Sequence, residues 1–167
     1  MRDILFKAKR IENGEWVEGN LVLTPKADED FKAIIIPFDD NGEYTEGVND
    51  NDLGFETWYK VDMTTICQYT GLTDKNGNKI WENDVVEFED TGEEGYEYKE
   101  GYDFINRARV EFAEARWSLT DFIDTNSGVV DEMYNHIEFM DFWQYCEVKG
   151  NIFDNAELIE GSEEEWD

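Results

Sequence analysis

The sequence predicts a mostly β fold, and three observations support this prediction. Short stretches that alternate apolar and polar side chains recur along the 167 residues, as they do in half-buried strands. Clusters of Asn, Asp and Gly separate these stretches, as turns separate strands. Few segments have the residue spacing of a helix. The expected architecture is therefore a small barrel of short strands with short helices at most.

The first predicted elements form a hairpin. Residues 3–11 alternate apolar and polar side chains, and residues 15–24 form the returning strand. Asn13-Gly14 between them is a strong short-range signal for a hairpin turn. Gly19, inside the second strand, indicates a bulge or a close approach of another backbone segment.

The middle of the chain contains three more predicted strands: residues 33–38, residues 59–72 and residues 85–88. Pro37 stops the first of them. Residues 39–56 are polar and form a long loop or an ordered excursion. Asp74-Lys75-Asn76-Gly77-Asn78 has the composition of a turn, with Gly at a position that favours a positive φ.

The second half is less regular. Residues 89–103 are acidic and glycine-rich and indicate a solvated loop or a hairpin tip. Residues 107–119 alternate like a strand, but an amphipathic helix competes because Ala, Glu and Arg favour helices. We expect a short helix near residues 129–136 and a closing strand at residues 146–152. The last seven residues, 161–167, form a loose acidic tail.

The net charge excludes several classes of function. The chain has 42 acidic and 14 basic residues, giving a formal charge of −28. Such a surface repels phosphate backbones and anionic membranes, so we expect no direct nucleic-acid or membrane binding. The first residues lack a signal peptide, and no apolar run is long enough to span a membrane. Cys67 and Cys146 lie far apart and are expected to be buried, reduced thiols of a cytoplasmic protein.

Motifs that would support catalysis or a cofactor are missing from the sequence. His136 is the only histidine, and there is no zinc, phosphate-loop or nucleophile-elbow motif. The acidic runs at residues 39–43 and 50–52 do not fit the EF-hand pattern. We therefore expect no enzyme activity, no cofactor and no dedicated metal site. A metal-dependent hydrolase or nuclease that uses clustered carboxylates remains the alternative.

Aromatic residues in the acidic segment are the best candidates for exposed anchors, because exposed tyrosines mark protein interfaces. Most of the tryptophans are expected in the core. The candidate partner-binding residues are Glu93, Glu94, Tyr96, Glu97, Tyr98 and Tyr102.

The run from Gln68 to Val86, QYTGLTDKNGNKIWENDVV, resembles the signature QYTGLKDKNGKEIYEGDIV of the YopX family of phage and prophage proteins. The opening residues 1–8, the central Val110-Glu111-Phe112 and the close at residues 148–159 resemble further islands of that family. The resemblance implies an N-terminal β portion followed by an SH3-like barrel. The family has no established activity, so the resemblance implies no catalytic residues.

Two departures from the family pattern matter. The acidic insert at residues 89–103 and the long loop at residues 39–56 are elaborations of this member, and the other departure is a single position in the signature. Asn83 stands where the family has Gly before Asp84, so a positive φ there would place an Asn in the left-handed region.

From these arguments we expect an N-terminal β portion at residues 1–58, an SH3-like barrel domain at 59–160 and the loose tail. The expected function is that of a non-enzymatic phage or prophage accessory protein that binds a host or phage protein. In a sharper form of this hypothesis, the acidic surface imitates DNA and occupies a basic partner. A structural homo-oligomer is a further alternative.

Overall fold

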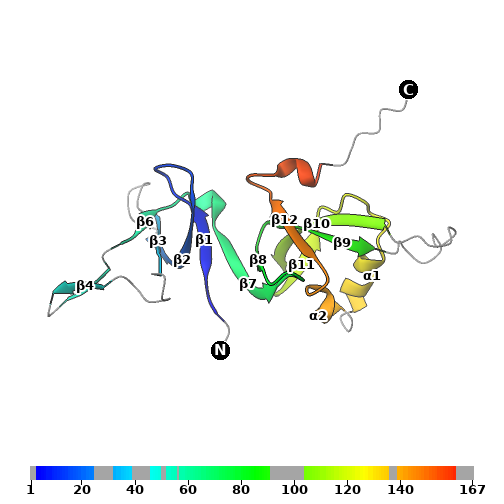
Figure 1. Cartoon of the computed structure of the whole chain (residues 1–167), viewed down its shortest axis with the longest axis horizontal. Coiled ribbons are helices and arrows are strands. Elements are labelled where there is room, and N and C mark those ends of the chain that lie inside the picture. Colours follow the sequence, from blue (N-terminus) through cyan, green and yellow to red (C-terminus); the bar gives the residue numbers. More distant parts are fainter. Residues whose placement is uncertain are drawn as a thin grey trace, which may run out of the picture. The chain divides into compact units, whose positions relative to one another are not determined.

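The computed structural model describes residues 3–24, 32–38, 46–49, 52–55, 57–90, 104–135 and 139–160. The chain divides into two compact units, Met1–Tyr69 and Thr70–Asp167. Strands dominate both units, which confirms the mostly β prediction (Figure 1). Among the described residues, no helix has the length and apolar character needed to cross a membrane.

The N-terminal unit is built on an antiparallel sheet with the strand order β6-β3-β2-β1-β7 (Figure 1). Strand β7 begins in this unit, where it pairs with β1, and ends in the C-terminal unit. The elements are β1 (Phe6–Lys9), β2 (Trp16–Leu23), β3 (Ala33–Ile36), the hairpin β4 (Glu46–Asn49) and β5 (Asp52–Phe55), β6 (Tyr59–Lys60), the 3-10 turn η2 (Met63–Thr65) and β7 (Cys67–Thr73).

The hairpin between β1 and β2 forms as predicted. Gly14 has a φ of 72°, and the Asn13 side chain accepts a hydrogen bond from the Glu15 backbone N–H at 3.0 Å. Gly19 lies against β3, where an added Cβ would sit 2.1 Å from the carbonyl oxygen of Ile36. The expected close backbone approach is therefore confirmed. A buried cluster of Ala8, Ala33, Ile35 and Val61 forms the core of this unit.

The C-terminal unit contains β8 (Lys79–Trp81), which pairs with the end of β7, and a four-stranded antiparallel sheet of order β11-β10-β9-β12. Its remaining elements are β9 (Asp84–Asp90), β10 (Phe104–Ala113), β11 (Arg116–Thr120), α1 (Gly128–Asn135), α2 (Phe139–Phe142), β12 (Glu147–Asn151) and the 3-10 turn η3 (Ala156–Leu158). Val129, Met133 and Phe142 from the helical segments join Val86 and Val110 of the sheet in one buried core.

Several local predictions are settled by this unit. Residues 107–119 belong to the β10–β11 hairpin, so the helical alternative is wrong. The short helix near residues 129–136 is confirmed as α1, and the closing strand is confirmed as β12. Within residues 39–56, the β4–β5 hairpin supports an ordered excursion.

The SH3-like barrel is not confirmed, because the described strands form open sheets and close no barrel. The α1 and α2 segments cover the inner face of the four-stranded sheet. The division into compact units falls between Tyr69 and Thr70, and the sequence analysis expected a boundary after residue 58. Strand β6 pairs with Ile34 and Ile35 of β3 within the N-terminal unit. The predicted tail, residues 161–167, lies outside the described residues.

Candidate functional site

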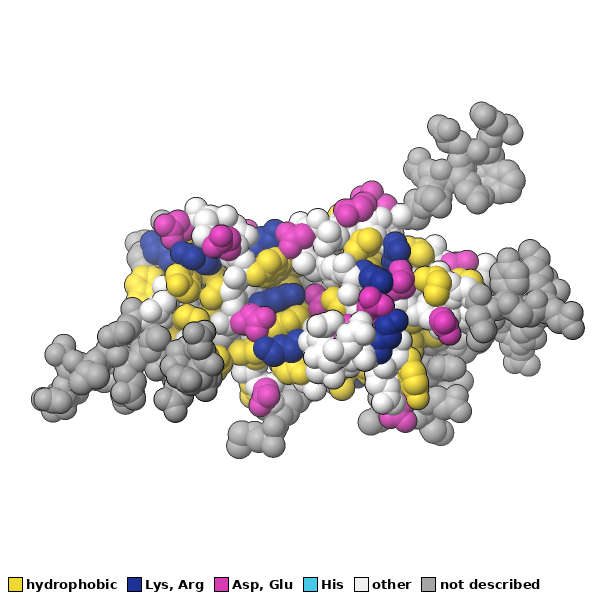
Figure 2. Space-filling view, in the orientation of Figure 1, with side chains coloured by type: hydrophobic (Ala, Val, Ile, Leu, Met, Phe, Trp, Pro, Cys, Tyr) yellow, Lys and Arg dark blue, Asp and Glu magenta, His cyan; other side chains and the backbone are white. Residues whose placement is uncertain are grey.

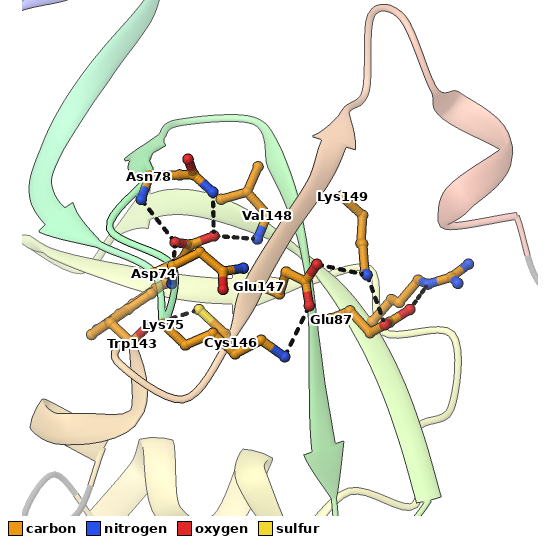
Figure 3. Close-up of polar contacts among 11 residues, drawn as sticks. Asp74, Lys75, Asn78, Glu87, Trp143, Cys146, Glu147, Val148 and Lys149 are labelled. Atoms are coloured by element: carbon orange, nitrogen blue, oxygen red, sulfur yellow. Dashed lines mark hydrogen bonds and ion pairs between the residues drawn. The ribbon is translucent and has the colours of Figure 1, made fainter.

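The signature turn between β7 and β8 is organised by one carboxylate. Asp74 is only 4% exposed. Its Oδ1 accepts hydrogen bonds from the backbone N–H groups of Asn76 and Asn78, both at 2.9 Å (Figure 3). Its Oδ2 accepts one from the Asn78 side chain at 3.2 Å and one from the Val148 N–H at 3.0 Å. Asp74 therefore fastens the turn to strand β12.

Burial raises the pKa of Asp74, but the hydrogen bonds donated by Val148, Asn78 and Asn76 outweigh burial and hold that pKa below its ordinary value. The group is a permanent acceptor at neutral pH. A general acid or base would need a pKa close to the working pH. The geometry therefore favours a structural role for Asp74.

A row of alternating charges runs from the turn between β7 and β8 across β12, β9 and β10. Lys75 pairs with Glu147 at 2.9 Å, Glu147 with Lys149 at 3.0 Å, Lys149 with Glu87 at 3.3 Å, and Glu87 with Arg107 at 2.8 Å (Figure 3). The hydrogen bond from Lys75 lowers the pKa of Glu147. For Glu87, burial raises the pKa, but the hydrogen bonds from Arg107 and Lys149 outweigh burial, so the pKa lies below its ordinary value. Because acids and bases alternate, this row is not an acidic patch.

Other polar side chains of the signature also form hydrogen bonds within the fold. Asp84 is 2% exposed and accepts the Trp81 N–H at 2.8 Å, and Thr70 donates its hydroxyl to the Ile80 carbonyl at 2.8 Å. Asn83 has a φ of 67°, as the sequence predicts for the position where the family signature has Gly. The signature therefore encodes turns and strand starts.

A third buried carboxylate, Asp90, was missed by the sequence analysis. Asp90 is 1% exposed and accepts hydrogen bonds from the Asn106 side chain at 2.9 Å, from the Ser127 hydroxyl and from the Val129 N–H at 3.3 Å. It holds the first turn of α1 against β9, in the way a capping residue satisfies helix N–H groups. Ser127, directly before the helix, was the available sequence signal.

The cysteines offer no reactive thiol. Cys67 and Cys146 are both free and buried, which confirms the expected burial and the expected lack of a disulfide between them. Burial, together with the charge of Asp74, raises the pKa of Cys146 to about 12. A nucleophilic thiol needs a lowered pKa and some exposure.

The sequence-predicted partner-binding residues Glu93, Glu94, Tyr96, Glu97, Tyr98 and Tyr102 lie outside the described residues, and so does His136. The acidic runs at 39–43 and 50–51 lie outside them as well. Within the described part of the chain, no group of three or more His, Cys, Asp or Glu side chains could hold a metal ion.

The N-terminal unit contains two adjoining hollows of about 400 and 560 Å³, which share Arg10 and Ile11. We refer to them together as the Arg10 hollow. Its remaining lining residues are Glu12, Trp58, Tyr59 and Lys60 on one side, and Lys9, Gly14, Lys32, Val61, Asp62 and Met63 on the other.

The Arg10 guanidinium lies 4.0 Å from the ring centroid of Tyr59 and pairs with Glu12 at 3.0 Å and with Glu15 at 3.8 Å. Its Nε is buried and has no hydrogen-bond partner among the described residues. The sequence analysis missed this site because a single bridge between Arg10 and Val61 joins two distant segments, and neither carries a recognisable motif.

The fold and the site define a small, mostly β protein of two compact units with an open hollow on the first. The chain belongs to the YopX family, whose model, described as YopX protein, matches residues 5–160. A solved structure described as protein EF1440 from Enterococcus faecalis is similar, with a TM-score of 0.52 and 21% identity, over 96% of this chain and 100% of that one. At this identity the likeness shows the fold alone. No match is found among curated proteins.

Proposed function

We propose that this member of the YopX family is a non-enzymatic phage or prophage accessory protein that acts by binding another protein. The observation that carries the proposal is the group of large apolar side chains exposed around the Arg10 hollow. Ile11 is 50%, Trp58 44% and Met63 49% exposed. Tryptophan and arginine are the side chains that most often anchor protein interfaces.

The chemistry of the other polar groups supports a binding role over catalysis. Asp74, Asp84 and Asp90 are buried, and their carboxylate oxygens accept hydrogen bonds from backbone and side-chain donors within the fold. The Cys146 thiol is protonated at neutral pH, because its pKa is about 12. Groups held in this way stabilise turns and strands.

The sharper form of the proposal, that an acidic surface imitates DNA and binds a basic protein, is supported by the net charge of −28. The row from Lys75 to Arg107 has three basic and two acidic groups, so the acidic partner surface would be sought at Glu93, Glu94 and Glu97. The test is to mix the protein with a panel of basic DNA-binding proteins at low and high salt. Failure to form any salt-sensitive complex rejects this form.

The proposal itself is tested by affinity capture on the immobilised whole chain, with salt elution and with heat-unfolded chain as the control. We expect a stoichiometric partner that the unfolded control does not retain. Two alternatives have their own readouts. Calorimetric binding of Mg²⁺, Mn²⁺ or Ca²⁺ tighter than millimolar would favour a metal-dependent hydrolase, and a mass in solution well above 19.6 kDa without a partner would favour a homo-oligomer.

A further inference from the structure

We infer that the Arg10 hollow binds an acidic peptide segment of the partner, one that carries carboxylates next to apolar side chains. The inference rests on the proposed function and names the chemistry that the hollow recognises. The hollow has a basic lining, whereas the candidate surface at Glu93, Glu94 and Glu97 is acidic, so the two surfaces can be tested separately.

Charge complementarity is the first argument. Four basic residues line the hollow, namely Lys9, Arg10, Lys32 and Lys60, against the acids Glu12 and Asp62 of the lining and Glu15, which pairs with Arg10. This excess of positive charge stands out in a chain whose net charge is −28. Salt screens charges beyond about 8 Å at physiological ionic strength, so a bound carboxylate responds mainly to this local lining. Figure 2 shows lysine and arginine side chains beside hydrophobic ones on the N-terminal part of the face in view.

Arg10 is suited to receive a carboxylate. Its guanidinium is stacked on Tyr59, so it is held in place before a ligand arrives. Its present ion-pair partners are mostly exposed, Glu12 at 81% and Glu15 at 71%. Exposed pairs contribute at most about 1 kcal/mol, so a ligand carboxylate can replace them at little cost.

The apolar rim supplies the second half of the recognition. Ile11, Trp58 and Met63 line the hollow and are each about half exposed. An apolar ligand side chain that covers them removes apolar surface from water, which contributes about 25 cal/mol per Å². Volumes of about 400 and 560 Å³ lie within the range of ligand sites.

The same features favour a peptide over a nucleic acid. A nucleic-acid strand carries one phosphate per nucleotide, and beyond the hollow those phosphates would meet the acidic remainder of the protein. A short peptide with one or two carboxylates places all of its negative charge within the basic lining. It also brings the aliphatic side chains that Ile11 and Met63 can contact.

The test uses the whole chain and a fluorescent, C-terminally amidated four-residue peptide in which glutamate alternates with leucine, measured by anisotropy at 50 mM salt. The comparison peptide replaces every glutamate by glutamine. We expect the glutamine peptide to bind about tenfold more weakly, as the loss of one charge-assisted hydrogen bond implies. Raising the salt to 300 mM should weaken the binding of the acidic peptide and leave the binding of the glutamine peptide unchanged.

Three variants locate the binding. Arg10→Gln and Trp58→Ala should each weaken the binding of the acidic peptide about tenfold. Lys79→Gln, which removes one positive charge from the exposed part of β8 in the C-terminal unit, should change binding less than about twofold. Circular dichroism checks the fold of each variant, and Lys60→Gln replaces Arg10→Gln if the latter does not fold.

Three results would overturn the inference. They are equal binding of the two peptides, binding that the hollow variants leave unchanged, and tighter binding of a single-stranded tetranucleotide at the same site. A partner that the whole chain captures equally well after Trp58→Ala also rejects the hollow, while leaving the proposed protein-binding function standing. Capture of no partner by the wild-type chain rejects the proposed function itself.

Discussion

Replacing Asp74 by Asn tests how the C-terminal unit is held together. The variant keeps one oxygen that can accept hydrogen bonds from the N–H groups of Asn76 and Asn78. In place of Oδ2, however, it has an NH₂ group, which cannot accept the hydrogen bonds from the Asn78 side chain and the Val148 N–H. The Val148 N–H then faces another donor. Hydrogen bonds to a charged acceptor contribute about 1.5–3 kcal/mol each, and an unsatisfied donor costs about 1–3 kcal/mol.

Allowing for the partial exposure of Val148, we expect Asp74→Asn to lower the free energy of unfolding by about 3 kcal/mol at pH 7. For a unit of this size the melting temperature should fall by on the order of 10–20 °C. The assays are urea unfolding followed by tryptophan fluorescence, and hydrogen exchange of the Val148 amide, which should become faster. Asp154→Asn is the matched control, because Asp154 is exposed and accepts one side-chain hydrogen bond from Asn151.

The pH dependence of this difference has a definite sign. The pKa of Asp74 is lowered in the folded chain, so its stabilisation is present above the ordinary pKa of 3.8 and is lost as the pH falls through the folded value. The variant lacks this titration. The gap in stability between the wild type and the variant should therefore be largest at pH 7 and should shrink below pH of about 4. A gap below about 0.5 kcal/mol, or one that is independent of pH, would refute the assignment.

Three further predictions concern backbone fit and thiol chemistry. Gly19→Ala should destabilise the N-terminal unit by about 2 kcal/mol or more in thermal unfolding, since the new Cβ meets the Ile36 backbone; an unchanged melting temperature would contradict the close packing. Asn83→Ala should be about 1–2 kcal/mol less stable than Asn83→Gly in urea unfolding, because only Gly relieves the positive φ; equal stabilities would mean that the φ is not strained. Cys146 should not react with a thiol-specific disulfide reagent at pH 8 until the protein is unfolded, since burial raises its pKa to about 12; fast reaction of the folded protein would show that the thiol is accessible.

Local turn chemistry allowed much of the fold to be predicted. Asn13-Gly14 and the turn from Asp74 to Gly77 place residues that tolerate a positive φ at the required positions, and both turns form. The β10–β11 turn was harder, because Glu114 and Ala115 adopt positive φ values of 51° and 63° without any Gly or Asn to signal them. Strand pairing on either side of the turn imposes that conformation.

The candidate site could not be predicted in the same way. Arg10 and Trp58 are separated by nearly the whole N-terminal unit in sequence, and the pairing of Arg10 with Val61 brings their segments together. Likewise Asp90 and Ser127 meet only because α1 packs on β9. Single-sequence patterns report periodicity within a segment, whereas these contacts depend on tertiary packing.

The hydrogen bond between Asp74 and Val148 has a consequence for synthesis on the ribosome. All residues of the N-terminal unit have been made by Tyr69, whereas the donor that Asp74 needs, the Val148 N–H, is made 74 residues after Asp74. At about 5–20 residues per second, the nascent chain spends roughly 4–15 s with no hydrogen bond from Val148 to this carboxylate. For roughly 3–12 s of that time, after β9 is complete at Asp90, β9 has an open edge where β12 will pair. Open strand edges recruit other chains, so a ribosome that stalls before Val148 would release a product prone to aggregate.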